Sequence, residues 1–157
     1  GYTVKLAGTE SGINEPQATF STGFGQPFLP RDAMVYAKLL AEKLNKHGAT
    51  CYFLNTGWCG GPYGVGKRMD LPATRAMLTA ALEGKLVNVP TQTDPIFGLH
   101  IPTAVPGVSP ELLIPRKCWP DGAAYDQKAK ELAGLFIKNF EKFPSATPDV
   151  KAAAPRG

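Results

Sequence analysis

The sequence has few of the residues that build metal centres and disulfide frameworks. Its 157 residues include three cysteines, Cys51, Cys59 and Cys118, and two histidines, His47 and His100. The cysteines are odd in number and show no C-x-x-C spacing, and the histidines stand far apart, so neither a zinc site nor a disulfide framework is expected. This composition fits a reducing compartment, and we expect the protein to be cytoplasmic.

Membrane segments and basic clusters are also missing. No run of about 18 apolar residues occurs, and the first residues, GYTVKLAGTE, lack the charged and apolar regions of a signal peptide. Lysine and arginine (17) outnumber aspartate and glutamate (13), but the basic residues do not form a block. We therefore expect binding to neither a membrane nor a nucleic acid.

The residues that are present predict one globular domain of the α/β class. Hydrophobic residues make up 43% of the chain and charged residues 19%, which are ordinary values for a folded domain. Periodicity and turn residues divide the chain into alternating strands, loops and helices. The predicted strands are residues 2–6 and 50–54, the predicted helices 32–46, 71–83 and 121–143, the long loop 8–26, and the proline-rich extended region 90–120.

The apolar residues of the three helices recur at helical spacing, which predicts the face that turns toward the core. These residues are Ala33, Tyr36, Ala37, Leu40, Ala41 and Leu44 in the first helix, Thr74, Met77, Leu78, Ala81 and Leu82 in the second, and Tyr125, Leu132, Phe136, Phe140 and Phe143 in the third. The segment TCYFL, Thr50–Leu54, is β-branched and aromatic and is predicted as a buried strand.

The glycine-rich stretch GGPYGVGKR invites comparison with a phosphate-binding P-loop. Gly61, Gly66 and Lys67 fit the beginning of G-x-x-x-x-G-K-[ST], but Arg68 stands where a serine or threonine hydroxyl would hold Mg²⁺. The helix does not start directly after Lys67, and Asp70, which intervenes, would repel a phosphate. The sequence therefore argues against a P-loop.

Two interpretations of this loop remain open. It is either a tight connection in which glycine supplies positive φ angles, or a loop that binds the base and sugar end of a nucleotide. For the second, the flat Arg68 guanidinium can stack on a purine and reach a phosphate, and Met69 can lie against a ring. Thr74, one turn into the helix, offers a hydroxyl to a heterocycle edge.

Several long blocks of the chain resemble ATP-dependent phosphoenolpyruvate carboxykinase. The blocks are KLAGTESGINEPQATFSTGFGQPFLP, NTGWCGGPYGVGKRMDLPATRAMLTAALEGKLVNV, FGLHIPTAVPGV and FIKNFEKF. They occur in the order and spacing of that family, and the resemblance runs from Tyr2 to Phe143. The matching region is the C-terminal portion of the family's mixed-sheet α/β nucleotide-binding domain. On this basis residues 1–144 belong to that portion, and residues 145–157 are expected to form a flexible tail.

The resemblance implies an enzyme of gluconeogenesis that converts oxaloacetate and ATP into phosphoenolpyruvate, ADP and CO₂. It also implies that the P-loop and the ligands of Mg²⁺ or Mn²⁺ lie upstream, in an N-terminal portion outside these residues. No catalytic or metal-binding residue is therefore expected here. Arg68 and Met69 match positions that flank the nucleotide, and Thr74 matches one that contacts the base.

Residues 9–24 resemble the family's segment that closes over the active site. Gly8, Gly12, Gly23 and Gly25 would give such a lid its hinge freedom. The alternative is a flexible linker.

Three roles for the chain follow. It is part of the enzyme and inactive alone, or a non-catalytic module that binds adenine nucleotide no better than about millimolar, or a structural piece of a larger core.

Overall fold

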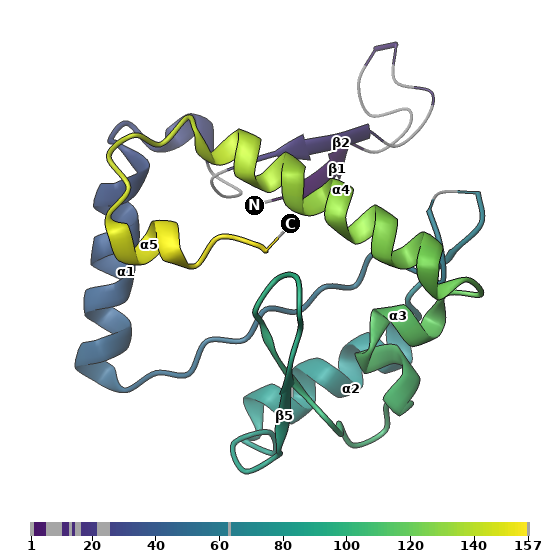
Figure 1. Ribbon diagram of the computed structural model, residues 1–157. Coiled ribbons are helices and arrows are strands. Elements are labelled where there is room, and N and C mark those ends of the chain that lie inside the picture. The colour runs from purple at the N-terminus through teal and green to yellow at the C-terminus, as the bar shows by residue number, and fades with distance from the viewer. Residues whose placement is uncertain are drawn as a thin grey trace. The chain divides into compact units, whose positions relative to one another are not determined.

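The computed structural model (Figure 1) describes residues 2–5, 11–12, 14, 17–21, 26–62 and 64–156, and within them the chain is mixed α/β. The helices are α1 (Ala33–His47), α2 (Leu71–Leu82), α3 (Pro115–Cys118), α4 (Gly122–Phe140) and α5 (Pro148–Ala152), with 3₁₀ turns η1 (Gln26–Phe28) and η2 (Pro110–Leu113). The strands are β1 (Tyr2–Lys5), β2 (Gln17–Phe20), β3 (Trp58–Cys59), β4 (Lys67–Arg68), β5 (Thr91–Thr93) and β6 (His100–Pro102). They pair as the antiparallel hairpins β1–β2, β3–β4 and β5–β6. The predicted α/β class is confirmed.

The chain forms two compact units. One contains residues 1–51 and 136–152, and the other contains residues 52–135 and 153–157. Helix α4 contributes to both, because the boundary falls after Leu135. None of the helices in the described residues has the length and apolar character needed to cross a bilayer.

The first unit begins with the β1–β2 hairpin, of which the sequence predicted only the first strand. The strand expected at residues 2–6 is confirmed as β1, but residues 17–20, predicted as loop, form β2, in register from Tyr2↔Phe20 to Lys5↔Gln17. The Phe20 ring meets the Phe136 ring edge-to-face with centroids 5.1 Å apart. Much of the predicted lid, residues 9–10, 13, 15–16 and 22–24, lies outside the described residues.

Helix α1 begins and ends as predicted because its signals are local. The Asp32 carboxylate accepts from the Met34 amide at 2.8 Å, and Gly48 ends the helix with φ 58°. The predicted core face is wrong in part, since Met34 is the buried residue and Leu40 is 59% exposed.

The C-terminal segment of this unit carries structure of its own. Ser145 Oγ donates to both carboxylate oxygens of Asp32, at 3.0 and 3.1 Å, Ala146 is buried, and helix α5 follows. The flexibility of residues 145–157 stays a prediction, because these contacts describe position and not motion.

The second unit is organised around a small apolar core. Ala80 of α2 lies in a cluster with Leu86, Val105, Val108 and Leu113. Helix α2 has its predicted boundaries, with Asp70 as N-cap and Gly84 at φ 69° just past its end. Its predicted core face is confirmed in part, since Met77 and Ala81 pack against this cluster, while the most buried positions are the small residues Ala73 and Ala80. The prediction that Leu78 and Leu82 face the core is wrong, for they are 49% and 79% exposed.

The predicted buried strand at residues 50–54 is not present. This segment has no regular secondary structure, and the Phe53 side chain is 86% exposed. A strand needs a neighbouring strand for its backbone N–H and C=O groups, and within the described part of the chain none pairs with it.

The proline-rich region, predicted as extended, contains the hairpin β5–β6 and also two short helical turns that were not predicted, η2 and α3. The last helix agrees with prediction at its start, where Asp121 Oδ1 accepts from the Ala123 amide at 2.8 Å. Its deepest residues are Ala129 and Ala133, which lie between the larger side chains predicted for that face.

Candidate functional site

The glycine-rich stretch forms a hairpin that leads directly into helix α2. Trp58 pairs with Arg68 and Cys59 with Lys67, and the Met69 amide extends the ladder by donating to the Gly57 carbonyl at 3.0 Å. Helix α2 starts only after this ladder has ended.

The loop between the two strands uses its amides internally. The amides of Val65 and Gly66 both donate to the Pro62 carbonyl, at 3.1 and 2.8 Å. In a P-loop such amides point outward and surround a phosphate, whereas these two are already occupied. The geometry therefore supports the view that this stretch is not a phosphate cradle.

Two glycines are required for distinct steric reasons. Gly60 has φ 78°, and a Cβ there would lie 3.0 Å from the Cys118 carbonyl oxygen. A Cβ on Gly66 would overlap the carbonyl oxygen of Gly61. The glycines thus let the hairpin close and let it approach α3.

The three predicted site residues lie within one continuous structural unit. Arg68 ends β4 with an exposed side chain, Met69 follows it half-buried, and Thr74 lies in the first turns of α2, half-buried. Asp70 connects them, because its carboxylate accepts from the Ala73 amide at 2.9 Å and so caps the helix.

The Thr74 hydroxyl has a defined role in this junction. Thr74 Oγ1 donates its proton to the Asp70 carbonyl at 2.9 Å, one helical turn back. A hydroxyl has one donor and two acceptor lone pairs, so the group that remains for a ligand is an acceptor. The prediction from sequence left this point open.

Trp58 is the residue of this region that sequence reasoning missed. It lies directly opposite Arg68 in the hairpin and is 40% exposed. The glycine and basic residues of GGPYGVGKR carry no signal for Trp58, because the pairing of two residues ten positions apart cannot be predicted from such a motif. Antiparallel pairing places the two side chains on the same face of the hairpin.

Two cysteine thiols lie near the hairpin. Partial burial raises the pKa of the Cys59 thiol. The pKa of the Cys118 thiol is also raised, mainly by burial and further by the nearby Cys59 and Glu111 side chains. Cys118 Sγ donates to the Glu111 carbonyl at 3.0 Å. A raised pKa keeps a thiol protonated at neutral pH and lowers its nucleophilicity.

No group of three or more histidine, cysteine, aspartate or glutamate side chains comes together as a metal site in the described residues. We therefore assign no metal-dependent step to these residues.

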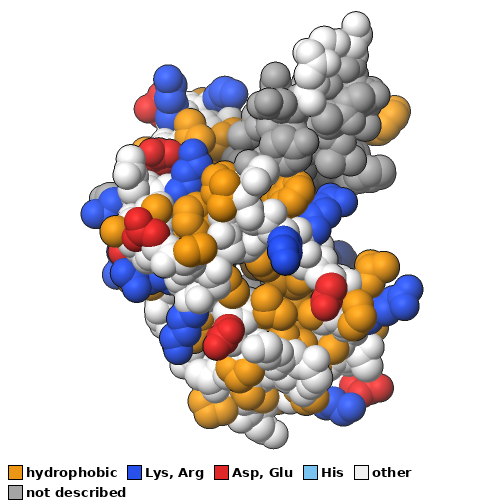
Figure 2. Space-filling model, turned by 90° about the vertical axis from the view of Figure 1, so that its right-hand side faces the viewer, with side chains coloured by type: hydrophobic (Ala, Val, Ile, Leu, Met, Phe, Trp, Pro, Cys, Tyr) orange, Lys and Arg blue, Asp and Glu red, His pale blue; other side chains and the backbone are white. Residues whose placement is uncertain are grey.

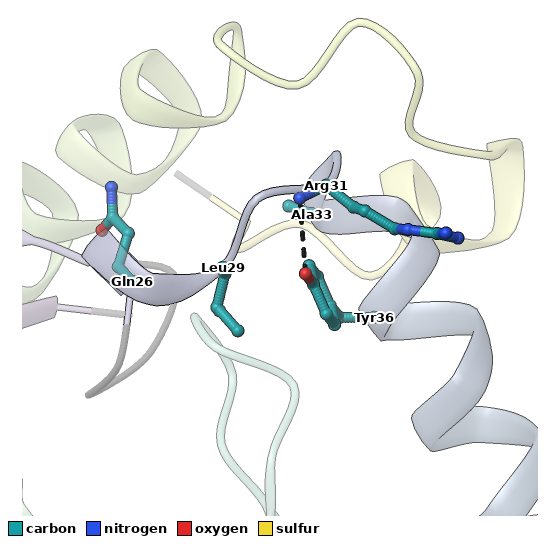
Figure 3. Close-up of a pocket in the computed structure, with 5 residues that line it drawn as sticks. All are labelled: Gln26, Leu29, Arg31, Ala33 and Tyr36. Carbon is teal, nitrogen blue, oxygen red and sulfur yellow. Dashed lines mark hydrogen bonds between the residues drawn. The ribbon is translucent and has the colours of Figure 1, made fainter.

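A depression of about 260 Å³ in the first unit is not a convincing ligand site (Figure 3). It is lined by Gln26, Leu29, Arg31, Ala33 and Tyr36, and the Arg31 amide donates to Tyr36 Oη at 3.3 Å. The Gln26 amide group and the Arg31 guanidinium point away from the space between Leu29 and Tyr36. Ligand pockets are usually about 300–1,000 Å³ with converging polar groups, and here the polar groups diverge.

The comparisons with known proteins all indicate one family. A family model described as phosphoenolpyruvate carboxykinase matches residues 1–111. The chain is 57% identical over 155 residues to a phosphoenolpyruvate carboxykinase (ATP) of Moorella thermoacetica, covering 99% of this chain and 30% of that protein. It is 58% identical over 147 residues to the Lysinibacillus sphaericus protein of that name, covering 94% of this chain and 28% of that protein.

A third relative, the phosphoenolpyruvate carboxykinase (ATP) of Caldanaerobacter subterraneus, is 55% identical over 157 residues, covering 100% of this chain. The chain spans about 30% of the length of these curated relatives. The family model covers more than half of the chain, and the relatives extend the similarity beyond residue 111 to nearly its whole length. The chain therefore belongs to the ATP-dependent phosphoenolpyruvate carboxykinase family.

Proposed function

We propose that this chain forms part of the adenine and ribose end of the ATP site in a phosphoenolpyruvate carboxykinase. The complete enzyme decarboxylates oxaloacetate and phosphorylates it from ATP, giving phosphoenolpyruvate, ADP and CO₂. The observation that carries the proposal is the junction of β4 and α2 in a chain that belongs to this family. It gathers an exposed cation, a thioether and an oriented hydroxyl within seven residues, Arg68–Thr74.

Arg68 has the properties expected of a nucleotide contact. Its guanidinium is exposed, and it has no ion-pair or hydrogen-bond partner among the described residues. The Arg116 guanidinium, by contrast, donates two hydrogen bonds to the Asp126 carboxylate, at 2.8 and 3.0 Å. An uncommitted guanidinium can reach a ribose or phosphate oxygen while its flat face lies against the base.

Thr74 is proposed to distinguish adenine from bases that present a carbonyl at the same edge. Because its proton is given to the Asp70 carbonyl, Thr74 Oγ1 offers acceptor lone pairs. The exocyclic amine of adenine can donate to such an oxygen, whereas the O6 carbonyl of hypoxanthine or guanine would oppose it. Met69 lies half-buried between Arg68 and the helix and is proposed to contact the ring.

The remaining machinery is assigned to the part of the enzyme beyond these residues. Phosphoryl transfer requires a cradle for the β- and γ-phosphates and metal ions that neutralise charge. We assign neither part to this chain, because the Val65 and Gly66 amides already donate to the Pro62 carbonyl and the described residues contain no group of three or more metal-binding side chains. We therefore expect the 157-residue chain to be inactive alone. Its position in the C-terminal part of the nucleotide-binding domain, the lid at residues 9–24 and a cytoplasmic location belong to the same proposal.

A structural contribution is favoured by a separate observation. Phe53, Leu71 and Leu82 are 86%, 65% and 79% exposed in this chain, and hydrophobic side chains reach the surface over much of the face shown in Figure 2. These exposed apolar side chains are available for contact with the remainder of the enzyme, and we propose that they make it. The two roles are compatible.

The proposal is tested in the full-length enzyme with two single variants and one control. Arg68→Ala should raise the KM for ATP about tenfold or more, since it removes a charge-assisted contact. Thr74→Val should reduce the preference for ATP over ITP, while Thr74→Ser should retain it. The matched control is Arg75→Ala, an exposed arginine one residue past Thr74. An unchanged KM in Arg68→Ala would remove Arg68 from the site.

A further inference from the structure

We propose that Trp58 is a further nucleotide-binding residue, whose indole provides a flat apolar surface on which the adenine base stacks beside Arg68. This inference rests on the proposed function, because it adds a residue to the same site. It was not indicated by any motif in the sequence and arises from the pairing of the hairpin.

The hydrogen-bond pattern of the hairpin makes Trp58 and Arg68 the closer of the two kinds of antiparallel pair. The Met69 amide donates to the Gly57 carbonyl, so residues 57 and 69 form a hydrogen-bonded pair of the ladder. Hydrogen-bonded and non-hydrogen-bonded pairs alternate in antiparallel strands, which makes Trp58 and Arg68 a non-hydrogen-bonded pair. In such pairs the Cα atoms are about 4.5 Å apart and the side chains are nearest to each other.

The hairpin therefore presents an aromatic plane and a guanidinium on one face, directly before the helix that carries Thr74. A purine offers two flat faces and a polar edge. Trp58, Arg68 and Thr74 carry the chemical groups that bind such faces and such an edge. An indole can cover one face, a guanidinium can lie on a face or reach the sugar, and the hydroxyl can read the edge. Aromatic side chains that stack on bases do so with every heterocycle, so Trp58 would contribute affinity and Thr74 selectivity.

The second tryptophan of the chain, Trp119, lies outside the candidate site. It meets the Tyr125 ring edge-to-face, with centroids 5.7 Å apart, at the turn between α3 and α4. Trp58 lies in the two-residue strand β3, directly opposite Arg68, and 40% of its surface is exposed. Trp119 is therefore the natural control.

The experiment measures ADP binding to the full-length enzyme by calorimetry. Trp58→Leu should weaken ADP binding by about 5- to 150-fold, the range found when a stacked aromatic residue is removed. Trp58→Phe should recover most of the affinity, because a smaller aromatic plane remains. Trp119→Leu should leave the affinity for ADP within about twofold.

A second ligand separates stacking from an effect on folding. Inorganic pyrophosphate has no base, so Trp58→Leu should bind it as the unaltered enzyme does. Unchanged ADP binding in Trp58→Leu, or an equal loss for ADP and pyrophosphate, would overturn the inference while leaving the proposed function in place. If the unaltered enzyme does not bind ADP, the proposed function itself fails, and that result is distinct from the other two.

Discussion

Helix α2 and the segment Thr50–Leu54 were both predicted as regular secondary structure, the first as a helix and the second as a buried strand, and only the helix forms. Beyond its first turn, the amides of α2 bond to carbonyls of the same helix, and the Asp70 carboxylate accepts from the first-turn amide of Ala73. Residues 50–54 have strong β character but find no partner strand among the described residues. A helix can be specified locally, whereas a strand depends on another part of the chain.

The largest effect is expected from a charge placed in the unpaired segment. Phe53→Asp should change the free energy of unfolding of the 157-residue chain by no more than about 0.5 kcal/mol, because Phe53 is 86% exposed there. In the full-length enzyme, where we expect a partner strand to cover this residue, the same change should cost about 3 kcal/mol or more. Urea denaturation of both proteins provides the measurement, and equal effects would contradict the idea that a partner strand is missing.

The next largest effect concerns the β3–β4 hairpin, in which, unlike residues 50–54, each strand pairs with another strand of this chain. Gly66→Ala should destabilise it by about 3 kcal/mol, because the new Cβ overlaps the Gly61 carbonyl oxygen. Gly64→Ala is the control. Gly64 has φ 84° but open space around its Cβ position, so only the backbone preference is lost, about 1 kcal/mol. Hydrogen exchange at the Met69 amide measures both, and equal protection in the two variants would show that the overlap is relieved at little cost.

A smaller effect tests how far α2 depends on its own cap. Asp70→Ala removes the acceptor of the Ala73 amide and should cost about 1 kcal/mol, which corresponds to roughly fivefold faster hydrogen exchange in the first turn. Asp70→Ser keeps a capping oxygen and should exchange nearly as slowly as the unaltered chain. If Asp70→Ala exchanges at the unaltered rate, tertiary packing and not the cap determines where α2 begins.

The smallest effect is a pH dependence, and it compares a contact between two elements with one inside a single helix. The Arg116 guanidinium of α3 lowers the pKa of the Asp126 carboxyl of α4, and Lys128 lowers the pKa of Glu131 in the same helix. A lowered carboxyl pKa gives stability that is present above the ordinary pKa, 3.8 for Asp126, and is lost as the pH falls through the lower folded value.

The difference in thermal midpoint between the unaltered chain and Asp126→Asn should therefore be positive at pH 7 and vanish in strong acid. The corresponding difference for Glu131→Gln should depend on pH in the same way but be smaller. Its partner Lys128 lies three residues away in the same helix, so the pair does not join two elements. Both pairs are exposed, so added salt should reduce both differences. A difference for Asp126→Asn that is independent of pH would assign its effect to packing.

The elements predicted well from sequence are those whose signals lie within a few residues. Helices α1 and α2 have their expected boundaries because Asp32 and Asp70 cap them and Gly48 and Gly84 end them. The core face of α2 was predicted only in part: Met77 and Ala81 pack against the core but Leu78 and Leu82 are exposed, because core neighbours such as Val105 approach from a distant part of the chain. Alanines allow that close approach, and the larger leucines turn outward.

The candidate site divides in the same way. Arg68, Met69 and Thr74 could be selected from sequence because they follow one another closely and have suitable chemistry, and the family resemblance selects the same three. The donation of the Thr74 hydroxyl to Asp70 and the position of Trp58 opposite Arg68 required the folded hairpin and helix.

The amino-acid sequence by itself determined the family, the helix boundaries and the residue types available to a nucleotide, because these depend on neighbouring residues and on their order. The tertiary structure decided which helix faces are covered, which strands find partners, and which side chains share the face of the hairpin. These outcomes depend on contacts between residues far apart in the chain, and such contacts leave no signal within any short segment.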